Sequence, residues 1–217
     1  MQPYFIPYAG YFRLFAAADL FVVYDCVQFP RRGWLHRNRL RDANGELRWL
    51  TLPLAKAERD VRIADLAYRS DAESELRAQA GRFSAFSALK IQHPNLHALA
   101  LTLDAPPARH LTELLCAISR LLGFEREMIL SSTLDLDPAL RGEARIVEIC
   151  RTLGARAYVN APGGRTLYAA ESFETSGVAL RFLSTYPGPT ESIVERLAHA
   201  PAAAIAEEIE AACALEA

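Results

Sequence analysis

The pattern of apolar and polar positions divides the first fifty residues into a short helix and three strands. A helix is predicted at 10–18, and the β-branched, aromatic run at 20–24 predicts a strand. An Asn-Gly dipeptide at 44–45 favours a tight turn, so the extended runs at 37–41 and 47–52 are expected to pair as a hairpin. The opening of the chain therefore mixes helical and extended structure.

Apolar residues at helical spacing dominate the middle of the chain. Ser70 and Glu73 have the spacing of a capping box, which predicts a helix that ends near Gly81. A second helix is predicted at 107–122, because its leucines and isoleucine recur every three or four residues. We therefore expect a helical subdomain over about residues 70–135.

The last third of the chain alternates between helices and strands. Helices are predicted at 137–153, 190–197 and 201–214, and strands at 156–160 and 178–183. Strands that are separated by helices are joined by crossovers and pair in parallel. The elements together predict an α/β fold with a mostly parallel sheet and flanking helices, in a Rossmann-like arrangement.

The composition is that of an ordinary globular protein and shows no boundary between domains. Of the 217 residues, 51% are apolar and 23% are charged, and no linker rich in Gly, Ser or Pro interrupts them. We therefore predict a single domain over residues 1–217. The formal net charge of −2 provides no overall field that would attract nucleic acid or an anionic membrane.

Neither a signal peptide nor a membrane span is predicted. Met1 is followed by Gln2, Pro3 and Tyr4 rather than by a basic and then an apolar region. No uncharged apolar run approaches the length of a membrane-spanning helix. A cytoplasmic protein without membrane insertion is expected.

The cysteines and histidines do not form a metal-binding pattern. The four cysteines lack CxxC spacing, so neither a zinc cluster nor a disulfide scaffold is indicated. His93 and His97 are four residues apart, but Pro94 follows the first of them and no acidic ligand stands at a helical offset. We predict no metal site and no tightly bound cofactor.

The opening segment is the first candidate for substrate binding. Gln2, Tyr4, Tyr8 and Tyr11 surround two prolines and a glycine just before and at the start of the predicted helix. A helix start offers free N–H groups and the positive end of a dipole to an anion, and tyrosines add stacking surfaces and hydroxyl donors. The alternative is a tight turn whose tyrosines pack against a neighbouring element.

The densest group of arginines forms the second candidate. On an extended segment, Arg37 and Arg39 face one side while His36 and Asn38 face the other. Arginine forks suit a diphosphate, a coenzyme tail or a phosphopantetheine arm. The residues Arg32, Arg37, Asn38 and Arg39 are therefore candidate substrate-binding residues. The alternative is a solvated edge strand that is guarded by charge.

Asp25 and Cys26 stand at the best catalytic position, directly after the strand at 20–24. The carboxyl ends of parallel strands point into the ligand crevice of α/β sheets. Asp25 is a candidate general base, or a partner that orients His36. Cys26 is a candidate acyl acceptor if a nearby cation favours its thiolate, and the alternative is a small buried side chain.

A second polar strand end occurs at Asn160. The loop after it contains Gly163 and Gly164, which allow backbone amides to approach a phosphate. The loop lacks the Lys-Ser/Thr pair of a P-loop, so hydrolysis of a nucleoside triphosphate is not indicated. We expect these three residues to contribute to substrate binding.

Five stretches of the chain resemble one family of bacterial proteins. They are residues 1–12, 21–29, 32–39, 49–53 and 149–164. These stretches are similar to the WbqC-like family, and the resemblance spans most of the chain, with its most specific part at the start. The resemblance implies a role in the synthesis of surface polysaccharides such as O-antigen, or in another biosynthetic pathway, without implying one shared reaction.

The chain departs from the pattern of this family at three places. Family members usually have a short apolar strand ahead of the Gln-Pro pair, where Met1 stands here. They commonly have two acidic residues where this chain has Asp25 and Cys26. An aromatic, proline-containing segment is replaced by residues 82–87, so substrate contacts from that segment are not carried over.

The residues and the resemblance together lead to three hypotheses for function. The first is acyl or aminoacyl transfer to the amine of an activated amino sugar or a similar small molecule, with a thioester of coenzyme A or of a carrier protein as donor. Asp25 and His36 would then manage the proton of the amine. The second is nucleotidyl or glycosyl transfer on a nucleotide sugar, and the third is a non-catalytic subunit that binds a carrier protein. None of the three has a nucleic-acid partner.

Overall fold

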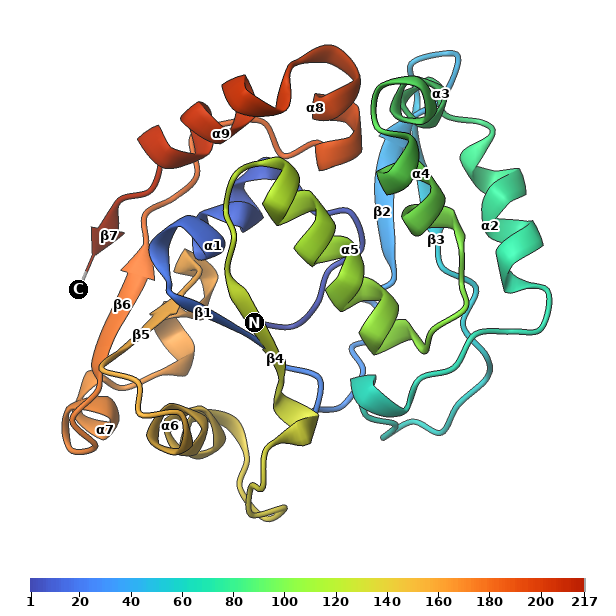
Figure 1. Ribbon diagram of the computed structural model, residues 1–217. Helices are drawn as coiled ribbons and strands as arrows, with labels where there is room; N and C mark the ends of the chain where they lie inside the picture. Colours follow the sequence, from blue (N-terminus) through green and yellow to red (C-terminus); the bar gives the residue numbers. More distant parts are fainter. Residues whose placement is uncertain (217) are drawn as a thin grey trace.

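Strand β1 (Leu20–Val23) lies near the middle of the molecule and pairs in parallel with β4 (Glu127–Leu130) (Figure 1). The computed structural model describes residues 1–216. The register places Leu20 opposite Glu127 and Val23 opposite Leu130. The sequence pattern predicts β1 but wrongly assigns 127–130 to the helical subdomain, because periodicity alone cannot classify a short apolar run that follows a helix.

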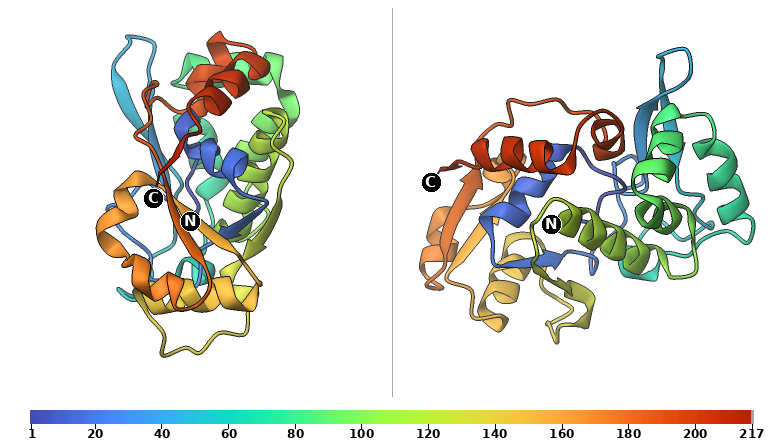
Figure 2. Two further views of the ribbon diagram at one scale, coloured as in Figure 1. Left: turned by 90° about the vertical axis from the view of Figure 1, so that its left-hand side faces the viewer. Right: turned by 45° about the horizontal axis from the view of Figure 1, so that its top comes forward.

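The predicted hairpin is confirmed as the antiparallel pair β2 (Arg37–Arg41) and β3 (Leu47–Thr51). Gly45 has a φ of +79° in the turn, a conformation that glycine adopts without steric cost. Along β2 the side chains of Asn38 and Leu40 are buried, whereas the arginines beside them reach the surface. The hairpin projects from one side of the molecule (Figure 2).

The last strands form a separate, mixed sheet. β5 (Ala157–Asn160) pairs in parallel with β6 (Ala179–Leu183), as expected for strands that are joined through a helix. β7 (Leu215–Glu216) then adds antiparallel to β6. The connection between β5 and β6 contains the 3-10 helix η4 (Pro162–Leu167) and α7 (Ala170–Glu174).

The fold is mixed α/β, as predicted. Among the described residues, two strand pairs are parallel and two are antiparallel, and they are distributed over three small sheets. The two parallel pairs belong to different sheets. A single, mostly parallel sheet of the Rossmann-like kind therefore remains a prediction.

The helical middle of the chain is confirmed as far as residue 121. Its four helices are α2 (Ala72–Ala80), α3 (Ser84–Gln92), α4 (Pro94–Leu101) and α5 (Pro107–Leu121). The apolar stripe of α5 is buried, as its spacing predicts. The start of α2 differs from the prediction, because Asp71 occupies the N-cap position and Ser70 makes no capping bond.

The remaining helices flank the strands at both ends of the chain. They are η1 (Ala9–Phe12), α1 (Arg13–Ala17), α6 (Gly142–Thr152), α8 (Ile193–His199) and α9 (Ala202–Ala211). Helix α6 begins five residues later than the pattern predicts, since the residues before it form a hydrogen-bonded turn closed by Leu140 N–H and the Asp137 carbonyl. The two tail helices are present as predicted.

Two hydrophobic clusters hold these elements together. The larger cluster joins β1, the hairpin, helices α1 to α5 and the tail helices, and the smaller one joins α6, α7 and β6. Arg13 is only 1% exposed and donates hydrogen bonds to the carbonyls of Ser184 and Ala212, which ties α1 to the C-terminal part of the chain. A buried cation is tolerated here because several carbonyls accept its donors.

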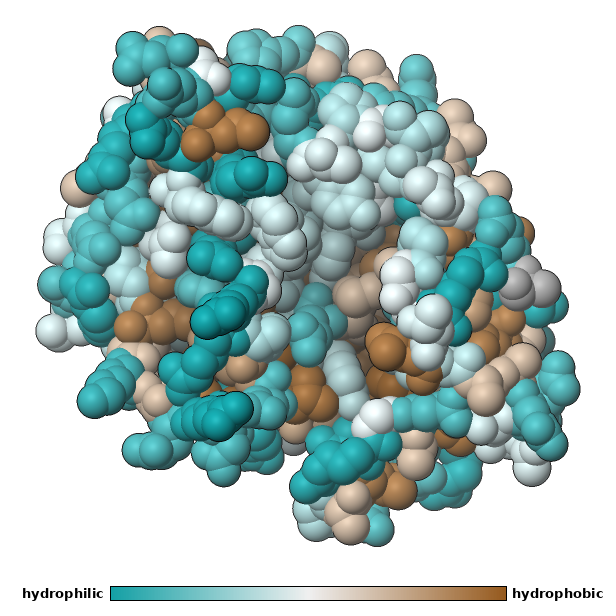
Figure 3. Space-filling model, turned by 180° about the vertical axis from the view of Figure 1, so that it is seen from behind, coloured by the Kyte–Doolittle hydropathy of each residue, from teal (hydrophilic) through white to brown (hydrophobic). Residues whose placement is uncertain are grey.

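No helix within residues 1–216 is both long enough and apolar enough to cross a bilayer. On the face opposite to that of Figure 1, hydrophobic residues reach the surface in scattered groups among polar ones (Figure 3).

Candidate functional site

The opening segment runs from the end of β1 to the hairpin. The amine of Met1 donates to the Val22 carbonyl at 2.7 Å. Four residues later, Phe5 N–H donates to the Leu35 carbonyl at 3.0 Å. The side-chain amide of Asn38 then donates to the Ile6 carbonyl at 2.6 Å. These bonds hold the tyrosine-containing segment against β2, so Asn38 positions the loop rather than pointing away from the protein.

The tyrosines of this segment differ in exposure and in role. Tyr11 is 7% exposed, and its hydroxyl donates to the Gln2 carbonyl at 2.8 Å, which fixes the turn. Tyr8 packs against Tyr186, with ring centroids 5.6 Å apart. Tyr4 is half-buried and points towards the hairpin. Burial raises the pKa of all three opening-segment phenols, so each remains a protonated donor at neutral pH.

The aromatic and cationic side chains of the hairpin gather beside Tyr4. The rings of Trp34 and Trp49 are 5.2 Å apart, and Tyr4 lies 6.0 Å from Trp34. The guanidinium of Arg37 lies 4.3 Å from the centre of Trp49, and that of Arg39 lies 5.4 Å from Trp34 and 5.6 Å from Trp49. We call these five residues the arginine–tryptophan cluster.

The cations of the arginine–tryptophan cluster are not neutralised. Within residues 1–216, neither Arg37 nor Arg39 has a carboxylate within ion-pair distance, whereas Arg48 on the neighbouring strand pairs with Asp42. Arg37 donates to the backbone carbonyls of Gly33 and Arg32, which fixes its orientation and gives Arg32 a backbone role. The tryptophans are 43% and 42% exposed, so the cluster is accessible to a ligand.

His36 stands directly before β2 and is neutral at physiological pH. Its burial and, to a lesser extent, the charge of Arg37 lower the pKa of the imidazole to about 4. The ring packs edge-on against Phe29 at 5.1 Å, and its Nδ1 is buried without a hydrogen-bond partner among the described residues. The burial that keeps the imidazole neutral also disfavours its protonated form, so His36 is a weak base that offers a hydrogen-bonding nitrogen rather than a charge.

Asp25 is buried at the end of β1, where it binds the first residues after β4. Its carboxylate accepts hydrogen bonds from the Ser131 hydroxyl at 2.9 Å, from Ser132 N–H at 2.8 Å and from the Ser132 hydroxyl at 2.6 Å. With 1% exposure, the carboxylate is largely occupied by these donors. Asp25 therefore fastens the ends of the two parallel strands together, and its serine partners give no signal in the sequence.

Cys26 lies beside a buried arginine that the sequence patterns do not reveal. Arg145 on α6 donates to the Cys26 carbonyl at 3.1 Å and lies 3.6 Å from its sulfur. A second donor of Arg145 reaches the Pro138 carbonyl at 3.2 Å, whereas its buried Nε has no partner within the described part of the chain. Arg145 is therefore the cationic neighbour of Cys26, and the partners of Asp25 are serines rather than His36.

Asn160 and the glycines after it form a rigid corner at the end of β5. The side-chain oxygen of Asn160 accepts from Ala161 N–H at 2.8 Å, and the residue is 7% exposed. A Cβ on Gly164 would lie 2.4 Å from the Asn160 amide nitrogen, whereas Gly163 has open space around it. Gly164 is therefore required because it lies against Asn160, whereas the backbone of Gly163 is open to the approach of a ligand.

The structure thus sorts the predicted site residues into separate groups. Tyr4, Arg37 and Arg39 come together in the arginine–tryptophan cluster. The two tryptophans of this cluster are not among the site residues that the sequence predicts. Asp25 and Cys26 make their contacts with residues after β4 and on α6 instead. Within residues 1–216, no group of three or more His, Cys, Asp or Glu side chains is arranged to hold a metal ion.

The fold and this geometry define a mixed α/β protein with an exposed cluster of aromatic and cationic side chains at a projecting hairpin. The chain belongs to the WbqC-like protein family, whose match covers residues 2–191. It is similar to the uncharacterized protein Rv1507c of Mycobacterium tuberculosis, with 28% identity over 189 residues that cover 80% of this chain and 76% of that protein. The comparison with solved structures found no match.

Proposed function

We propose that the arginine–tryptophan cluster binds the phosphorylated part of a small molecule, and that the protein is a cytoplasmic transferase of bacterial surface-polysaccharide or related biosynthesis. The observation that carries the proposal is the placement of Arg37 and Arg39 against tryptophan rings, without a carboxylate partner within residues 1–216. The donors that these arginines do not use for backbone carbonyls are open to an anionic ligand. Membership of the WbqC-like family supports the biosynthetic setting.

A nucleotide-linked amino sugar fits the chemistry of this surface. Its diphosphate would accept hydrogen bonds from the two guanidinium groups, and its base would stack on the exposed ring of Trp34. The protonated hydroxyl of Tyr4 adds a neutral donor beside them. Because aromatic rings and two neighbouring cations occur together on this surface, it favours a ligand that has both a ring and a phosphate.

The proposed reaction is acyl or aminoacyl transfer to the amine of that sugar. The amine nitrogen attacks the carbonyl carbon of a thioester, the C–N bond forms, and the C–S bond of the coenzyme A or carrier-protein donor breaks. The proton that the amine loses ends on the departing thiolate, and His36, whose imidazole is neutral, is the residue proposed to relay it. No other co-reactant is needed, because the thioester supplies the driving force.

Asp25 and Cys26 have distinct proposed parts in this scheme. Asp25 acts through position, since it holds the strand end in place with its three acceptor bonds. Cys26, whose sulfur lies 3.6 Å from Arg145, would serve a two-step form of the transfer: its sulfur attacks the donor thioester and releases the donor thiol, and the amine then attacks the S-acyl cysteine, whose C–S bond breaks. Incubation with a thioester donor followed by mass spectrometry of the intact protein tests this relay: full transfer by a Cys26→Ala variant would remove the cysteine from the mechanism.

The binding proposal is tested by calorimetric titration with UDP-glucosamine. Replacing both Arg37 and Arg39 by Ala is expected to weaken binding by at least about 100-fold, because two charge-assisted hydrogen bonds together contribute about 3 kcal/mol or more. Arg48→Ala is the matched control, since Arg48 lies on the same hairpin but is already paired with Asp42. Equal affinity of the double variant and the control would contradict the proposal.

Binding of a carrier protein without catalysis is the second candidate function. It is favoured by two exposed tryptophans, Trp49 on β3 and Trp34 in the turn before β2, because aromatic and arginine residues are enriched at protein interfaces. In that case the unaltered protein would bind an acyl carrier protein and form no acylated product, and the double arginine variant would no longer bind it.

A further inference from the structure

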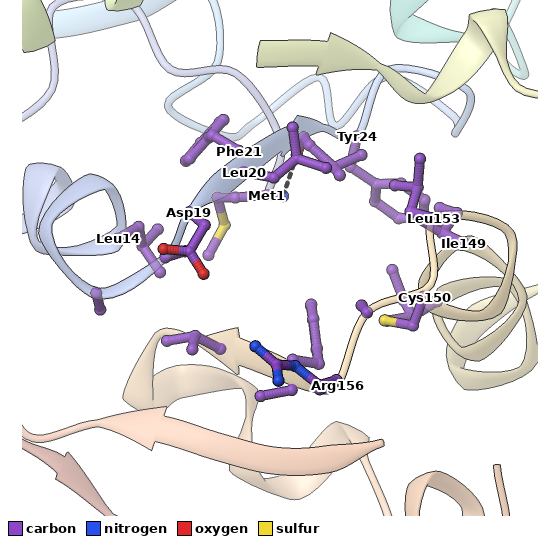
Figure 4. A pocket seen from close by; sticks show the side chains of 18 of the residues that line it. Met1, Leu14, Asp19, Leu20, Phe21, Tyr24, Ile149, Cys150, Leu153 and Arg156 are labelled. Atoms are coloured by element: carbon purple, nitrogen blue, oxygen red, sulfur yellow. Dashed lines mark hydrogen bonds between the residues drawn. The ribbon is translucent and has the colours of Figure 1, made fainter. Parts of the chain in front are cut away.

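Strand β3 forms the outer edge of the hairpin, and its surroundings differ from those of β1. Strand β1 lines a groove of about 430 Å³ that is mainly apolar, with Asp19 and Arg156 on opposite walls (Figure 4). The outer edge of β3 lies instead on the hairpin that projects from the body of the molecule (Figure 2). Its neighbours are cations and exposed tryptophans, and these indicate which chemistry would bind there.

The register of the hairpin decides which backbone groups of β3 point outward. Just beyond the strand, Leu52 N–H donates to the His36 carbonyl at 2.8 Å, so this pair of residues is a hydrogen-bonded one. Along an antiparallel ladder, hydrogen-bonded pairs alternate with pairs whose N–H and C=O groups point away from each other. The outward-pointing groups of β3 therefore belong to Leu47, Trp49 and Thr51.

Side chains already occupy several outward positions of the hairpin. Thr51 N–H donates to Oε1 of Gln79 at 3.0 Å, and Nε2 of Gln79 donates to the Thr51 carbonyl at 3.3 Å. This side-chain amide makes the two bonds that a neighbouring strand would make. On β2, Arg41 N–H donates to the Glu195 carboxylate at 2.6 Å, and Arg39 N–H donates to the side chain of the preceding residue at 2.8 Å. Strand addition is blocked at these positions.

The outward backbone groups of Leu47 and Trp49 remain open. Neither residue's N–H or C=O has a hydrogen-bond partner across residues 1–216, and the two residues are 48% and 42% exposed. An exposed strand edge with free N–H and C=O groups is a template on which another extended chain adds as a strand. About four residues of extended chain would cover this stretch, because the Gln79 amide occupies the next position, at Thr51.

The exposed face beside this open edge is positively charged. Leu47 and Trp49 share that face with the arginines of β2, since side chains alternate along each strand. The guanidinium of Arg37 lies 4.3 Å from the centre of the Trp49 ring, and that of Arg39 lies 5.6 Å from it, so both cations reach across to β3. An added strand would lie about 4.8 Å from β3, within reach of these cations for a Glu side chain.

The charges favour an acidic partner over a second copy of this chain. If two β3 edges paired symmetrically, the arginines of both copies would lie on the same face of the joined sheet. Like charges placed close together across strands are destabilising. An acidic segment would instead supply the carboxylates that Arg37 and Arg39 lack in the described part of the chain.

We propose that the open edge of β3 binds a short, extended, acidic segment of a partner protein by strand addition. The backbone of the segment bonds to Leu47 and Trp49, and acidic side chains at every second position meet Arg37 and Arg39. The backbone edge is distinct from the small-molecule site of the proposed function, although both ligands would contact the same two guanidinium groups.

The first test measures the fluorescence anisotropy of a labelled Glu-Val-Glu-Val-Glu-Val peptide on the full chain. Leu47→Pro removes one outward N–H, and proline is tolerated on the open side of an edge strand. This variant is expected to bind the peptide at least about tenfold more weakly than the unaltered protein, because a carbonyl of the peptide loses its donor. Leu47→Ala is the matched control: it shortens the side chain but keeps the N–H, and it should weaken binding less than about threefold.

A second test uses the unaltered protein and does not depend on how the proline variant folds. Saturation with the same peptide should slow hydrogen exchange of the Leu47 and Trp49 amides at least about tenfold, because each N–H gains an acceptor. The Leu50 amide is the internal control. It already faces β2, so its exchange should change much less.

Several results would overturn the proposal. They are absence of peptide binding, equal affinity of the two Leu47 variants, unchanged exchange of the Leu47 and Trp49 amides in the complex, and equal binding of a Lys-Val-Lys-Val-Lys-Val peptide. Self-association of the unaltered protein that Leu47→Pro abolishes would make a second copy the occupant and would overturn it as well. Leu47→Pro should keep its affinity for UDP-glucosamine, because the arginine–tryptophan cluster is unaltered, so this proposal and the proposed function fail separately.

Discussion

At the scale of single residues, Asp25 and Cys26 make their side-chain contacts with residues that are distant in the sequence and belong to no motif. Arg145 reaches Cys26 across 119 positions, and Ser131 reaches Asp25 across 106. Neither partner stands out in the sequence, since buried arginines and serines are identified only by what surrounds them. The glycines after Asn160 also depend on their surroundings. Gly164 is crowded by the Asn160 side chain, whereas the adjacent Gly163 has open space around it.

The two adjacent glycines allow a matched prediction. Gly164→Ala is expected to destabilise the protein by about 1–3 kcal/mol, because the new Cβ would lie 2.4 Å from the buried Asn160 amide. Gly163→Ala has open space and should change the free energy of unfolding by less than about 1 kcal/mol, in the stabilising direction. Urea unfolding of both variants checks this, and equal midpoints would contradict the role assigned to Asn160.

At the scale of elements, local signals place most helices and strands correctly, but they misplace the start of α6 and misidentify the cap of α2. The spacing of Ser70 and Glu73 predicts a capping box, yet the carboxylate of Glu73 accepts from Leu103 N–H at 2.9 Å and from Arg77 at 3.0 Å. The glutamate therefore ties α2 to the chain after α4. The tertiary contact with Leu103 uses the Glu73 carboxylate, which a capping box would need as its acceptor.

This difference predicts opposite outcomes for the two capping-box residues. Ser70→Ala should change stability by less than about 0.5 kcal/mol, because the serine caps nothing. Glu73→Gln should cost about 1 kcal/mol, since Leu103 N–H keeps only a weaker, neutral acceptor. Thermal unfolding of the two variants measures both effects. A larger loss of stability in the serine variant would support the capping box instead.

At the scale of the whole molecule, burial of basic groups couples stability to pH. The Met1 amine has a pKa of about 5 in the folded protein, against 8.0 for an unperturbed terminus, and that of His36 is about 4, against 6.5. Both groups bind protons more readily in the unfolded chain than in the folded one. Stability due to the amine is therefore complete above pH 8 and is lost as the pH falls towards 5.

The 217-residue chain should accordingly become more stable as the pH rises from 5.5 to 8. The buried amine alone contributes a slope of up to about 1.4 kcal/mol per pH unit, and the partly exposed His36 contributes less and only below about pH 6.5. Urea midpoints over this range provide the measurement. A slope that persists in a chain with an acetylated Met1 amine would show that another group is responsible.

The sequence by itself determines the features that depend on neighbouring residues. The hairpin follows from an Asn-Gly turn and alternating side chains, α5 follows from its apolar spacing, and the arginines on one face of β2 follow from the two-residue period of a strand. The resemblance to the WbqC-like family, read from the opening residues, is confirmed over residues 2–191. All of these depend on periodicity or on a contiguous motif.

Only the tertiary structure decides the features that depend on long-range packing. It places Trp34 and Trp49 beside the two arginines, and it places two serines after β4 where they donate hydrogen bonds to the Asp25 carboxylate. It also leaves a groove beside β1. Strand β4 belongs here as well, because four apolar residues become a strand only through pairing with β1. The physical reason is the same in each case: burial and hydrogen bonding depend on which surfaces meet, and chain neighbours alone do not specify those surfaces.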